Sequence, residues 1–260
     1  MDEWAGVTPG TICVASGDLA RYSRFCNSMM QLWAPPETQT RWSCGLNVAA
    51  NFNHCIRNME GDWVWIMGDD HVFAPDTLMR LLKHDVDVVV PIVIRRQPPF
   101  IPVLFKRRVP NSTSPQGTFP YLKWGELPQH GLIGMEEGLY VAGSAGMLIR
   151  KRVLDLVGDP WFEVGQCGRE VINEDAHFCE KIAALGIELH ADMDTWMGHV
   201  TPMTIWPSRA ESGAWTTALD MGGPRLFQLP VGSADVIANE LGGERVHDSA
   251  VKNVPINQGG

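Results

Sequence analysis

Short apolar runs alternate with helix-like segments along the first 94 residues, and this alternation constrains the fold more than any other feature. The length and apolar composition of three runs predict strands at Thr11–Ser16, Asp62–Met67 and Asp87–Ile94, and a further strand is predicted at Thr38–Ser43. Strands that alternate with helices form right-handed crossovers, which place the strands parallel to one another in one sheet. We therefore predict an α/β fold in which ligands bind beyond the carboxyl ends of the strands.

Helical spacing of apolar residues fills the gaps between these strands. Asp18 is predicted to cap a helix that runs to about Trp33, and a second helix is predicted after Gly45. Pro75 is predicted to open a third helix, where Asp76 complements the helix dipole.

The second half of the chain has a different sequence pattern. Residues 109–138 are rich in proline, glycine and polar side chains, and a loop of this length is usually functional or disordered. Further elements are predicted as strands at Tyr140–Ala142, Gly146–Arg150 and Ile187–Asp192 and as a helix from Asn173 to Leu185. The periodicity fades after this point, so we expect one domain over residues 1–206 and a partly irregular C-terminal extension over 207–260.

Composition limits the classes of protein that this chain can belong to. A chain of 260 residues with 45% hydrophobic composition can bury a large core. The longest apolar stretch, near Val88–Ile94, is too short to span a membrane, and the N-terminus lacks a secretory pattern. Six cysteines without a C-x-x-C pair argue against a zinc ribbon or a disulfide scaffold. We expect a cytoplasmic protein with no transmembrane segment.

The charge is unevenly distributed along the sequence. The net charge is −9, yet residues 91–152 hold nine Lys or Arg against three acids, which makes this segment +6. A solvated basic face explains a single basic cluster well. Three clusters in one segment, Arg95–Arg96, Lys106–Arg108 and Arg150–Arg152, also suit an anionic ligand on the acceptor side of a binding site.

Two acids and a histidine directly follow the third apolar strand. Asp69, Asp70 and His71 thus lie at the predicted ligand-binding edge of the sheet. Oxygen ligands suit Mg²⁺ or Mn²⁺, and an imidazole ligand favours Mn²⁺. Such a cation would neutralise a diphosphate leaving group. The alternative is that the acids merely end the strand and cap the next helix.

At these residues the chain resembles a known family. The run DWVWIMGDDHVFAPDTLMRLL resembles the D-x-D segment of GT-A glycosyltransferases, especially family 2-like enzymes. Three later runs are similar to further motifs of these enzymes in the same order: VAGSAGMLIRKRVLDLVGDPWF to the acceptor loop, NEDAHFCEKIAALGIEL to the acidic motif of a late helix, and MGHVTP to the late metal-binding histidine. The resemblance covers roughly Thr11 to Trp206, and it implies a GT-A fold and a nucleotide-sugar donor.

The resemblance also implies a metal site. Asp70 would contact the cation, Asp69 would contact the cation or the donor ribose, and His199 would close the site from a distant strand. His71 fits a D-x-H variant of the motif. Gly68 departs from the family, because many relatives have another Asp there. A lone histidine near an apolar segment is also commonly structural, which is the alternative for His199.

By the same resemblance, Asp175 is the general base of an inverting enzyme, with Glu174 as the second choice. Acids in the first turn of a helix are also commonly present to stabilise its dipole. Ser16, Asp18 and Arg21 would hold the nucleotide base and ribose, although Asp18 also suits a helix cap. If the enzyme retains configuration, neither Asp175 nor Glu174 need act as a base.

On the acceptor side, we expect Ser144, Trp161, Arg95 and Arg96 to contact the substrate. The predicted function is transfer of one sugar from a nucleotide-diphosphate donor, UDP-linked, to a hydroxyl acceptor. A single sugar is expected because the Q-x-x-R-W signature of processive polymerases is absent. Anionic acceptors such as hydroxymethylated DNA, a lipid phosphate or a sugar phosphate suit the basic clusters. The alternatives are a nucleotidyltransferase and a non-catalytic module that binds nucleotide sugars.

Overall fold

The fold was obtained as a computed structural model of the whole chain. It describes residues 4, 6–17, 22–96, 100–109, 119–167 and 170–202 and the strands at 204–209, 215–220 and 226–229. The chain divides into two compact units, Met1–Val200 and Thr201–Gly260. Asp18 and Arg21, both predicted to bind the donor, lie outside the described residues.

The first unit is built from strands and helices that alternate, as the sequence predicts. Its main strands are β1 (Thr11–Ser16), β2 (Gln39–Cys44), β3 (Trp63–Gly68), β4 (His71–Phe73), β5 (Val88–Val93), β7 (Leu132–Ile133), β9 (Met147–Arg150) and β12 (Leu189–His199). Its helices are α1 (Ser23–Gln31), α2 (Val48–Arg57), α3 (Thr77–Lys83), α4 (Lys151–Val157) and α5 (Glu174–Ala184), with a 3₁₀ turn η1 at Trp124–Glu126. The four strands predicted before residue 95 agree with β1, β2, β3 and β5 to within one residue at each end.

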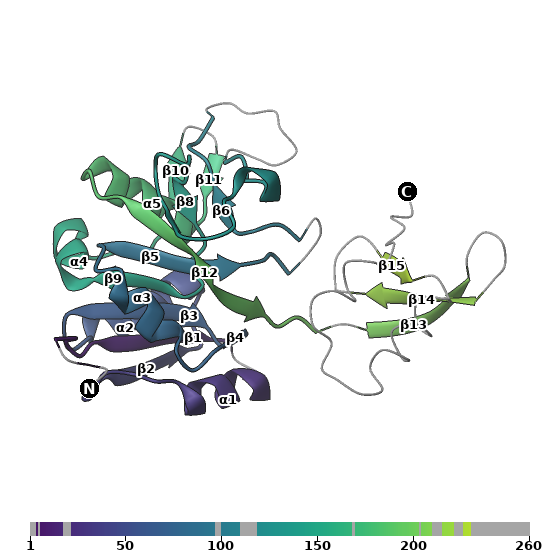
Figure 1. Cartoon of the computed structure of the whole chain (residues 1–260), viewed down its shortest axis with the longest axis horizontal. Helices are drawn as coiled ribbons and strands as arrows, with labels where there is room; N and C mark the ends of the chain where they lie inside the picture. Colours follow the sequence, from purple (N-terminus) through teal and green to yellow (C-terminus); the bar gives the residue numbers. More distant parts are fainter. Residues whose placement is uncertain are drawn as a thin grey trace. The chain divides into compact units, whose positions relative to one another are not determined.

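One sheet organises the first unit (Figure 1). The described residues form an eight-stranded sheet in the order β2-β1-β3-β9-β5-β12-β4, with β7 also paired to β12. Strands β1, β2 and β3 are parallel to each other, as are β5 and β12, whereas β9, β4 and β7 run antiparallel to their neighbours. The prediction of a mostly parallel α/β sheet is confirmed.

Two small sheets of the first unit share no strand with the main sheet. They are β6 (Leu104–Phe105) with β8 (Val141–Ala142), and β10 (Gly165–Cys167) with β11 (Glu170–Ile172). The sequence predicts strands on both sides of Gly143–Ala145, and both exist. However, β8 pairs with β6 while β9 enters the main sheet, so the short link carries the chain from one sheet to the other.

Helix starts follow local capping chemistry only in part. The Asn47 side chain accepts a 2.8 Å hydrogen bond from Ala50 N and so caps α2. Asp76 precedes α3, but its carboxylate pairs with Arg80 at 2.7 Å and makes no capping bond. Pro75 was predicted to open this helix, which in the structure begins two residues later, at Thr77.

The sheet is covered by helices on both faces. One buried cluster joins α2, α4 and α5 to alternate strand residues such as Ile66, Val88 and Met147. The other joins α1 and α3 to the residues between them, such as Trp65 and Val89. Because neighbouring strand residues point to opposite faces, both faces of the central strands are buried, which explains their continuous apolar composition.

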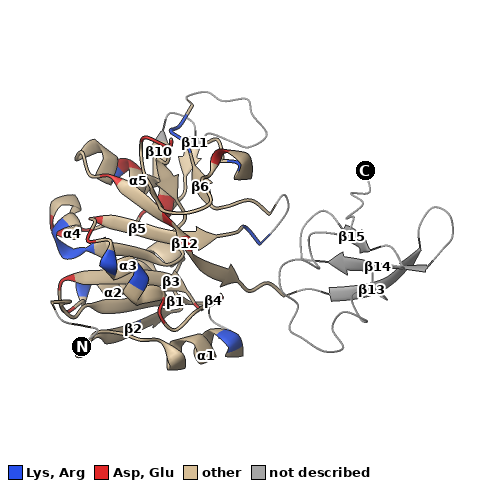
Figure 2. Ribbon diagram, in the orientation of Figure 1, with Lys and Arg blue, Asp and Glu red and all other residues tan. Residues whose placement is uncertain are grey.

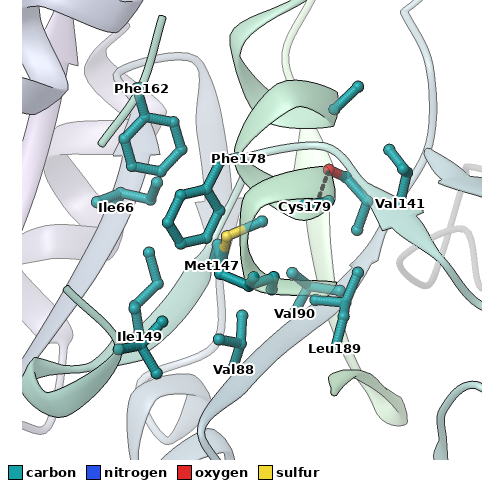
Figure 3. Close-up of a cluster of buried hydrophobic side chains, with 14 of the residues drawn as sticks. Ile66, Val88, Val90, Val141, Met147, Ile149, Phe162, Phe178, Cys179 and Leu189 are labelled. Carbon is teal, nitrogen blue, oxygen red and sulfur yellow. Dashed lines mark hydrogen bonds between the residues drawn. The ribbon is translucent and has the colours of Figure 1, made fainter. Parts of the chain in front are cut away.

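Helix α5 is anchored in the first of these clusters (Figure 3). The Phe178 ring stacks on Phe162 with centroids 4.6 Å apart, and the Cys179 thiol donates to Ala142 O at 3.7 Å. Both α5 side chains are fully buried. This packing fixes the helix that begins with the two predicted catalytic acids.

Truncation of Phe178 is therefore expected to destabilise the first unit strongly. Phe178→Ala removes a fully buried ring, and such changes lower the free energy of unfolding by about 3–5 kcal/mol. Met30, which is 86% exposed, provides the control, since Met30→Ala is expected to change it by less than about 0.5 kcal/mol. Urea denaturation followed by circular dichroism measures both. Equal midpoints for the two variants would contradict this packing.

The described residues of the second unit form the strands β13 (Thr204–Arg209), β14 (Trp215–Asp220) and β15 (Leu226–Leu229). They form an antiparallel sheet in the order β13-β14-β15. The fading periodicity of the sequence after residue 206 gives no indication of this sheet.

Candidate functional site

The Asp69–Asp70 turn is held in place by strand pairing. Strand β3 ends at Gly68, the chain turns at Asp69 and Asp70, and His71 begins β4. β4 pairs antiparallel with the end of β12, which places His71 directly opposite His199. His199 is the final residue of β12, which continues beyond a bulge between Asp192 and Trp196.

This pairing brings three potential metal ligands together. Asp70, His71 and His199 each offer a ligand atom, and these atoms lie within 4.8 Å of one another. The two imidazole rings stack with centroids 4.5 Å apart. Asp69 is 8% exposed and lines a cavity beside these three residues, but it does not belong to this group.

The hydrogen bonds of His71 show where the lone pair of its ring lies, whereas both ring nitrogens of His199 face protein oxygens. His71 Nδ1 faces two acceptors, Asp70 Oδ1 at 3.0 Å and Gly68 O at 3.2 Å, so we place its hydrogen on Nδ1. Its Nε2 then carries the lone pair, and this buried atom has no hydrogen-bond partner among the described residues. His199 differs, because its Nδ1 faces Ile94 O at 3.1 Å and its Nε2 faces Asp70 Oδ2 at 3.2 Å. Nδ1 bonds to protein acceptors are how metal-ligating histidines are usually oriented.

Asp70 is the most strongly perturbed acid of the group. Its Oδ2 lies 3.2 Å from His199 Nε2 and 3.0 Å from a guanidinium nitrogen of Arg96. Burial by itself raises the pKa of the Asp70 carboxyl, but the hydrogen bonds from His199 and His71 outweigh it and hold the pKa well below its usual range. Asp70 is therefore ionised over the physiological range of pH.

These observations fit a divalent cation. One ionised carboxylate and two imidazoles form a mixed oxygen and nitrogen set, which suits Mn²⁺ better than Mg²⁺; His71 Nε2 already carries a lone pair, whereas His199 Nε2 would exchange its bond to Asp70 for the ion. The unpartnered Nε2 of His71 is the particular feature that such an ion would satisfy.

Gly68 has a structural reason in this arrangement. A Cβ at this position would lie 2.8 Å from Asp70 Oδ1, where the carboxylate is held by His71. The residue that departs from the family pattern thus gives Asp70 the room for its bond to the histidine.

A cavity of about 880 Å³ opens beside this group. It is lined by the three potential ligands and by further residues predicted from the sequence: Ser16, Asp69, Arg96, Ser144, Glu174 and Asp175. The Ser16 hydroxyl is buried and makes no hydrogen bond within the described part of the chain. The structure therefore brings residues from the ends of several strands and from α5 into one cavity.

Several lining residues were missed by the sequence analysis. Tyr22 precedes α1, and Asn51 and Phe52 lie on α2. Asn51 accepts a 2.8 Å hydrogen bond from the Ser43 hydroxyl and donates to Leu46 O. No pattern in the sequence distinguishes these side chains from ordinary core and surface positions of amphipathic helices.

Asp175 lies where this cavity meets a second one. The second cavity, of about 430 Å³, is also lined by Asp175 and Val103, together with Arg95, Phe105 and Tyr121. Removal from water, and then the neighbouring Glu174 carboxylate, raise the pKa of Asp175 to about 6. A carboxyl group with such a pKa can accept a proton near neutral pH.

Glycine keeps the junction between the two cavities open. A Cβ at Gly143 would lie 2.8 Å from Val103 Cγ1 and 3.7 Å from Asp175 Oδ2. Ser144, the predicted acceptor contact, follows directly. The small-residue loop between β8 and β9 therefore borders the Asp175 carboxyl.

The wall of the second cavity is aromatic and basic. Arg95 donates to the Tyr121 hydroxyl at 2.7 Å and lies 5.5 Å from the centre of that ring, and Phe105 packs against Tyr121. Arg95 and Arg96, predicted to act together, thus face different cavities: Arg96 lines only the larger one, beside Asp70.

Trp161 does not join the other predicted residues. Its ring packs against the core and its Nε1 donates to Leu154 O at 2.8 Å, and it lines neither of the two cavities. A tryptophan beside a loop was expected to offer a platform for a sugar, but here the ring contributes to the core instead.

The basic clusters do not form one surface. Figure 2 shows basic and acidic residues interspersed over the first unit. Arg150 pairs with Trp63 at the start of β3, so the Arg150–Arg152 cluster lies at the opposite end of the strand from Gly68 and the metal group. Its side chains pair with Asp85, Asp155 and Asp87. The expectation that this cluster flanks the acceptor site is wrong, because β9 runs antiparallel to β3.

Two further basic side chains, Lys106 and Arg108, also pair with acids. Lys106 pairs with Glu126 at 2.7 Å and Arg108 with Glu180 at 3.1 Å. Arg107 lies over the Tyr140 ring at 5.4 Å. Five of the nine basic residues in 91–152 thus pair with acids from other parts of the chain: Arg96, Arg108, Arg150, Lys151 and Arg152.

No helix in the described part of the chain is both long enough and apolar enough to cross a bilayer. The family model for glycosyl transferase family 2 matches residues 40–132, which include the Asp69–His71 turn but neither Asp175 nor His199. Among solved structures, the chain is similar to that titled "Crystal Structure of A197 from STIV", with 10% identity, a TM-score of 0.48 and coverage of 79% of this chain and 92% of that chain. A search of curated protein sequences finds no match. Residues 40–132 thus match the glycosyl transferase family 2 model, and the mixed α/β fold with its mostly parallel sheet is consistent with the GT-A type.

Proposed function

We propose that this protein transfers one sugar from a nucleotide-diphosphate sugar, UDP-linked, to a hydroxyl acceptor, and that a divalent cation assists departure of the diphosphate. The observation that carries the proposal is the position of Asp175. Its carboxyl, with a pKa of about 6, lies at the junction of a cavity that contains the Asp70, His71 and His199 group and a second, aromatic cavity.

The larger cavity is the proposed donor site. Asp70, His71 and His199 would hold Mn²⁺ or Mg²⁺, which when bound neutralises charge on the diphosphate. Ser16 and Asp69 lie in the same cavity at the carboxyl ends of β1 and β3, where they can bind the nucleoside part of the donor. The unpartnered Ser16 hydroxyl supports its role as a ligand contact.

The second cavity is the proposed acceptor site. An acceptor hydroxyl at the junction gives its proton to Asp175 while its oxygen attacks the anomeric carbon of the donor. A carbon–oxygen bond forms on one face of the sugar as the bond to the diphosphate breaks on the other, and UDP leaves. This sequence of events inverts the configuration of the sugar.

The acceptor is proposed to be a small hydroxyl compound. The Tyr121 and Phe105 rings offer apolar surface, and Arg95 is the basic side chain at this wall. An extended polyanion such as hydroxymethylated DNA has less support, because the basic residues at 106, 108 and 150–152 are paired with acids. An acceptor with one phosphate or carboxylate near Arg95 remains consistent with this wall.

The location is proposed from the thiols. Each of the five cysteines whose side chains the structure describes is free. Free thiols favour a reducing compartment, and we propose the cytoplasm.

A screen of nucleotide sugars with and without Mn²⁺ tests this function. Transferases commonly hydrolyse their donor slowly when water replaces the acceptor, so UDP release from one UDP-sugar, dependent on Mn²⁺, is the expected result. Tight donor binding with neither hydrolysis nor transfer across an acceptor panel would instead indicate a binding module. Release of pyrophosphate from a nucleoside triphosphate would indicate a nucleotidyltransferase.

The pH dependence of donor turnover is expected to follow Asp175. Because the base must be deprotonated, kcat/KM should fall about tenfold per pH unit below pH 6 and become level above about pH 7. Glu174→Gln should move the inflection to lower pH, since the Glu174 charge raises the pKa of Asp175. A profile that is flat between pH 5 and 8 would remove Asp175 from the role of base.

A further inference from the structure

We propose that Arg96 is an electrostatic latch on the cation site: its guanidinium holds Asp70 when no cation is bound, and moves to the donor diphosphate when a cation takes its place. The inference rests on the proposed function of the larger cavity. It assigns to Arg96 a positioning role that differs from the acceptor contact expected from the sequence.

Arg96 and a bound cation would compete for the same oxygen of Asp70. Arg96 Nη1 lies 3.0 Å from Asp70 Oδ2, the same oxygen that faces His199 Nε2 at 3.2 Å. A divalent ion binds a carboxylate oxygen at about 2.0–2.2 Å and is repelled by a guanidinium at the same atom. A cation bound by Asp70 and His199 therefore requires Arg96 to withdraw.

The Arg96 side chain is exposed enough to move away from Asp70. Its side chain is 47% exposed, whereas the Asp70 side chain is 17% exposed. Asp70 is also held through its other oxygen, Oδ1, by His71 Nδ1 at 3.0 Å, so the acid stays in place when the arginine leaves. The neighbouring Arg95 contrasts with it, because that guanidinium is fixed both by the Tyr121 hydroxyl and by the face of the ring.

A diphosphate bound in the larger cavity would give the released guanidinium a new partner. Arg96 lines the larger cavity together with Ser16 and Ser144, so the guanidinium stays within reach of an anion bound there. A planar guanidinium forms paired hydrogen bonds with phosphate oxygens, which an ammonium group does not match. A diphosphate that enters with the cation thus offers Arg96 a replacement for Asp70.

The latch couples the two ligands. Cation binding costs the Arg96–Asp70 ion pair when the cation binds alone, and the diphosphate restores a partner for Arg96 when both are present. By linkage, the cation strengthens UDP binding by the same factor by which UDP strengthens cation binding. The device keeps the site from retaining a free metal ion in the absence of donor.

Titration calorimetry on the full chain with Mn²⁺ alone, and then with UDP at saturating Mn²⁺, tests the latch. Arg96→Gln is expected to bind Mn²⁺ about fivefold more tightly than the wild type, because the competing ion pair is gone. The same variant is expected to bind UDP about tenfold more weakly, because a charged hydrogen bond to phosphate is lost. Two opposite shifts from one substitution are not expected from a merely structural residue.

Arg95→Gln provides the charge-matched control. It removes one positive charge from the adjacent position, yet Arg95 bonds to Tyr121 and not to Asp70, so its Mn²⁺ affinity should stay within about twofold of the wild type. Circular dichroism melts of both variants establish that the fold is retained.

The outcomes separate the latch from the function beneath it. Unchanged or weaker Mn²⁺ binding by Arg96→Gln, with normal binding by the wild type, overturns the latch and leaves the cation site intact. An equal gain in Arg95→Gln overturns it as well, since the effect would then be general electrostatics. If neither the wild type nor Arg96→Gln binds Mn²⁺, the proposed cation site fails and the latch fails with it.

Discussion

Replacement of Asp175 by asparagine is expected to slow sugar transfer about a thousandfold, within the range that a positioned general base contributes. Asparagine keeps the size of the side chain but cannot take the proton of the acceptor hydroxyl. Donor binding should be unaffected, because the metal group that would hold the diphosphate does not include Asp175. Single-turnover transfer and calorimetry with UDP and Mn²⁺ measure the two properties separately.

Glu174→Gln is the matched control for this experiment. It neutralises the adjacent acid of the same helical turn, and we expect less than a tenfold loss at pH 8, where Asp175 is deprotonated in either protein. A parallel loss of transfer and of UDP affinity in Asp175→Asn would show that this residue supports the structure of the cavity rather than the chemistry.

Removal of Asp70 or His199 is expected to weaken Mn²⁺ binding by more than about a hundredfold. Substitutions that only orient a metal ligand already lower affinity by about 10–100-fold, and loss of a direct ligand exceeds this. Asp70→Ala also removes the charged oxygen ligand of the set, so its effect should be the larger. Metal-dependent UDP binding should disappear in both variants.

The fold should survive both changes, because Asp70 lies in a turn and His199 at the end of a strand. His130→Ala serves as a control, since His130 is an exposed histidine paired with Asp194 and not with the metal group. Undiminished Mn²⁺ affinity in both Asp70→Ala and His199→Ala would remove the metal assignment.

The first half of the fold was predictable because its signals are local. β1, β3 and β5 are continuous apolar runs, since helices bury both of their faces, and glycine, proline and asparagine mark the breaks between elements. Periodicity cannot show pairing across long distances. It did not reveal that β9 runs antiparallel between β3 and β5, which is why the Arg150–Arg152 cluster was placed on the wrong side.

The site was predictable by residue type more than by geometry. The sequence placed Asp69, Asp70, His71 and His199 in one group, and the pairing of β4 with β12 brings the last three together, whereas Asp69 stays outside the group. The opposed directions of Arg95 and Arg96 depend on the loop after β5, where adjacent side chains point to different cavities. The packing of the partly buried Trp161 ring against the core depends on how α4 is placed, which a tryptophan beside a loop does not reveal.

Crystals grown with UDP and Mn²⁺ and measured near the manganese absorption edge test the cation site most directly. We expect one anomalous peak at ligand distance from Asp70, with His71 Nε2 or His199 Nε2 as a further ligand and diphosphate oxygens completing the shell. UDP bound in the larger cavity with Arg96 still on Asp70, and no anomalous peak beside residues 69–71, would contradict it.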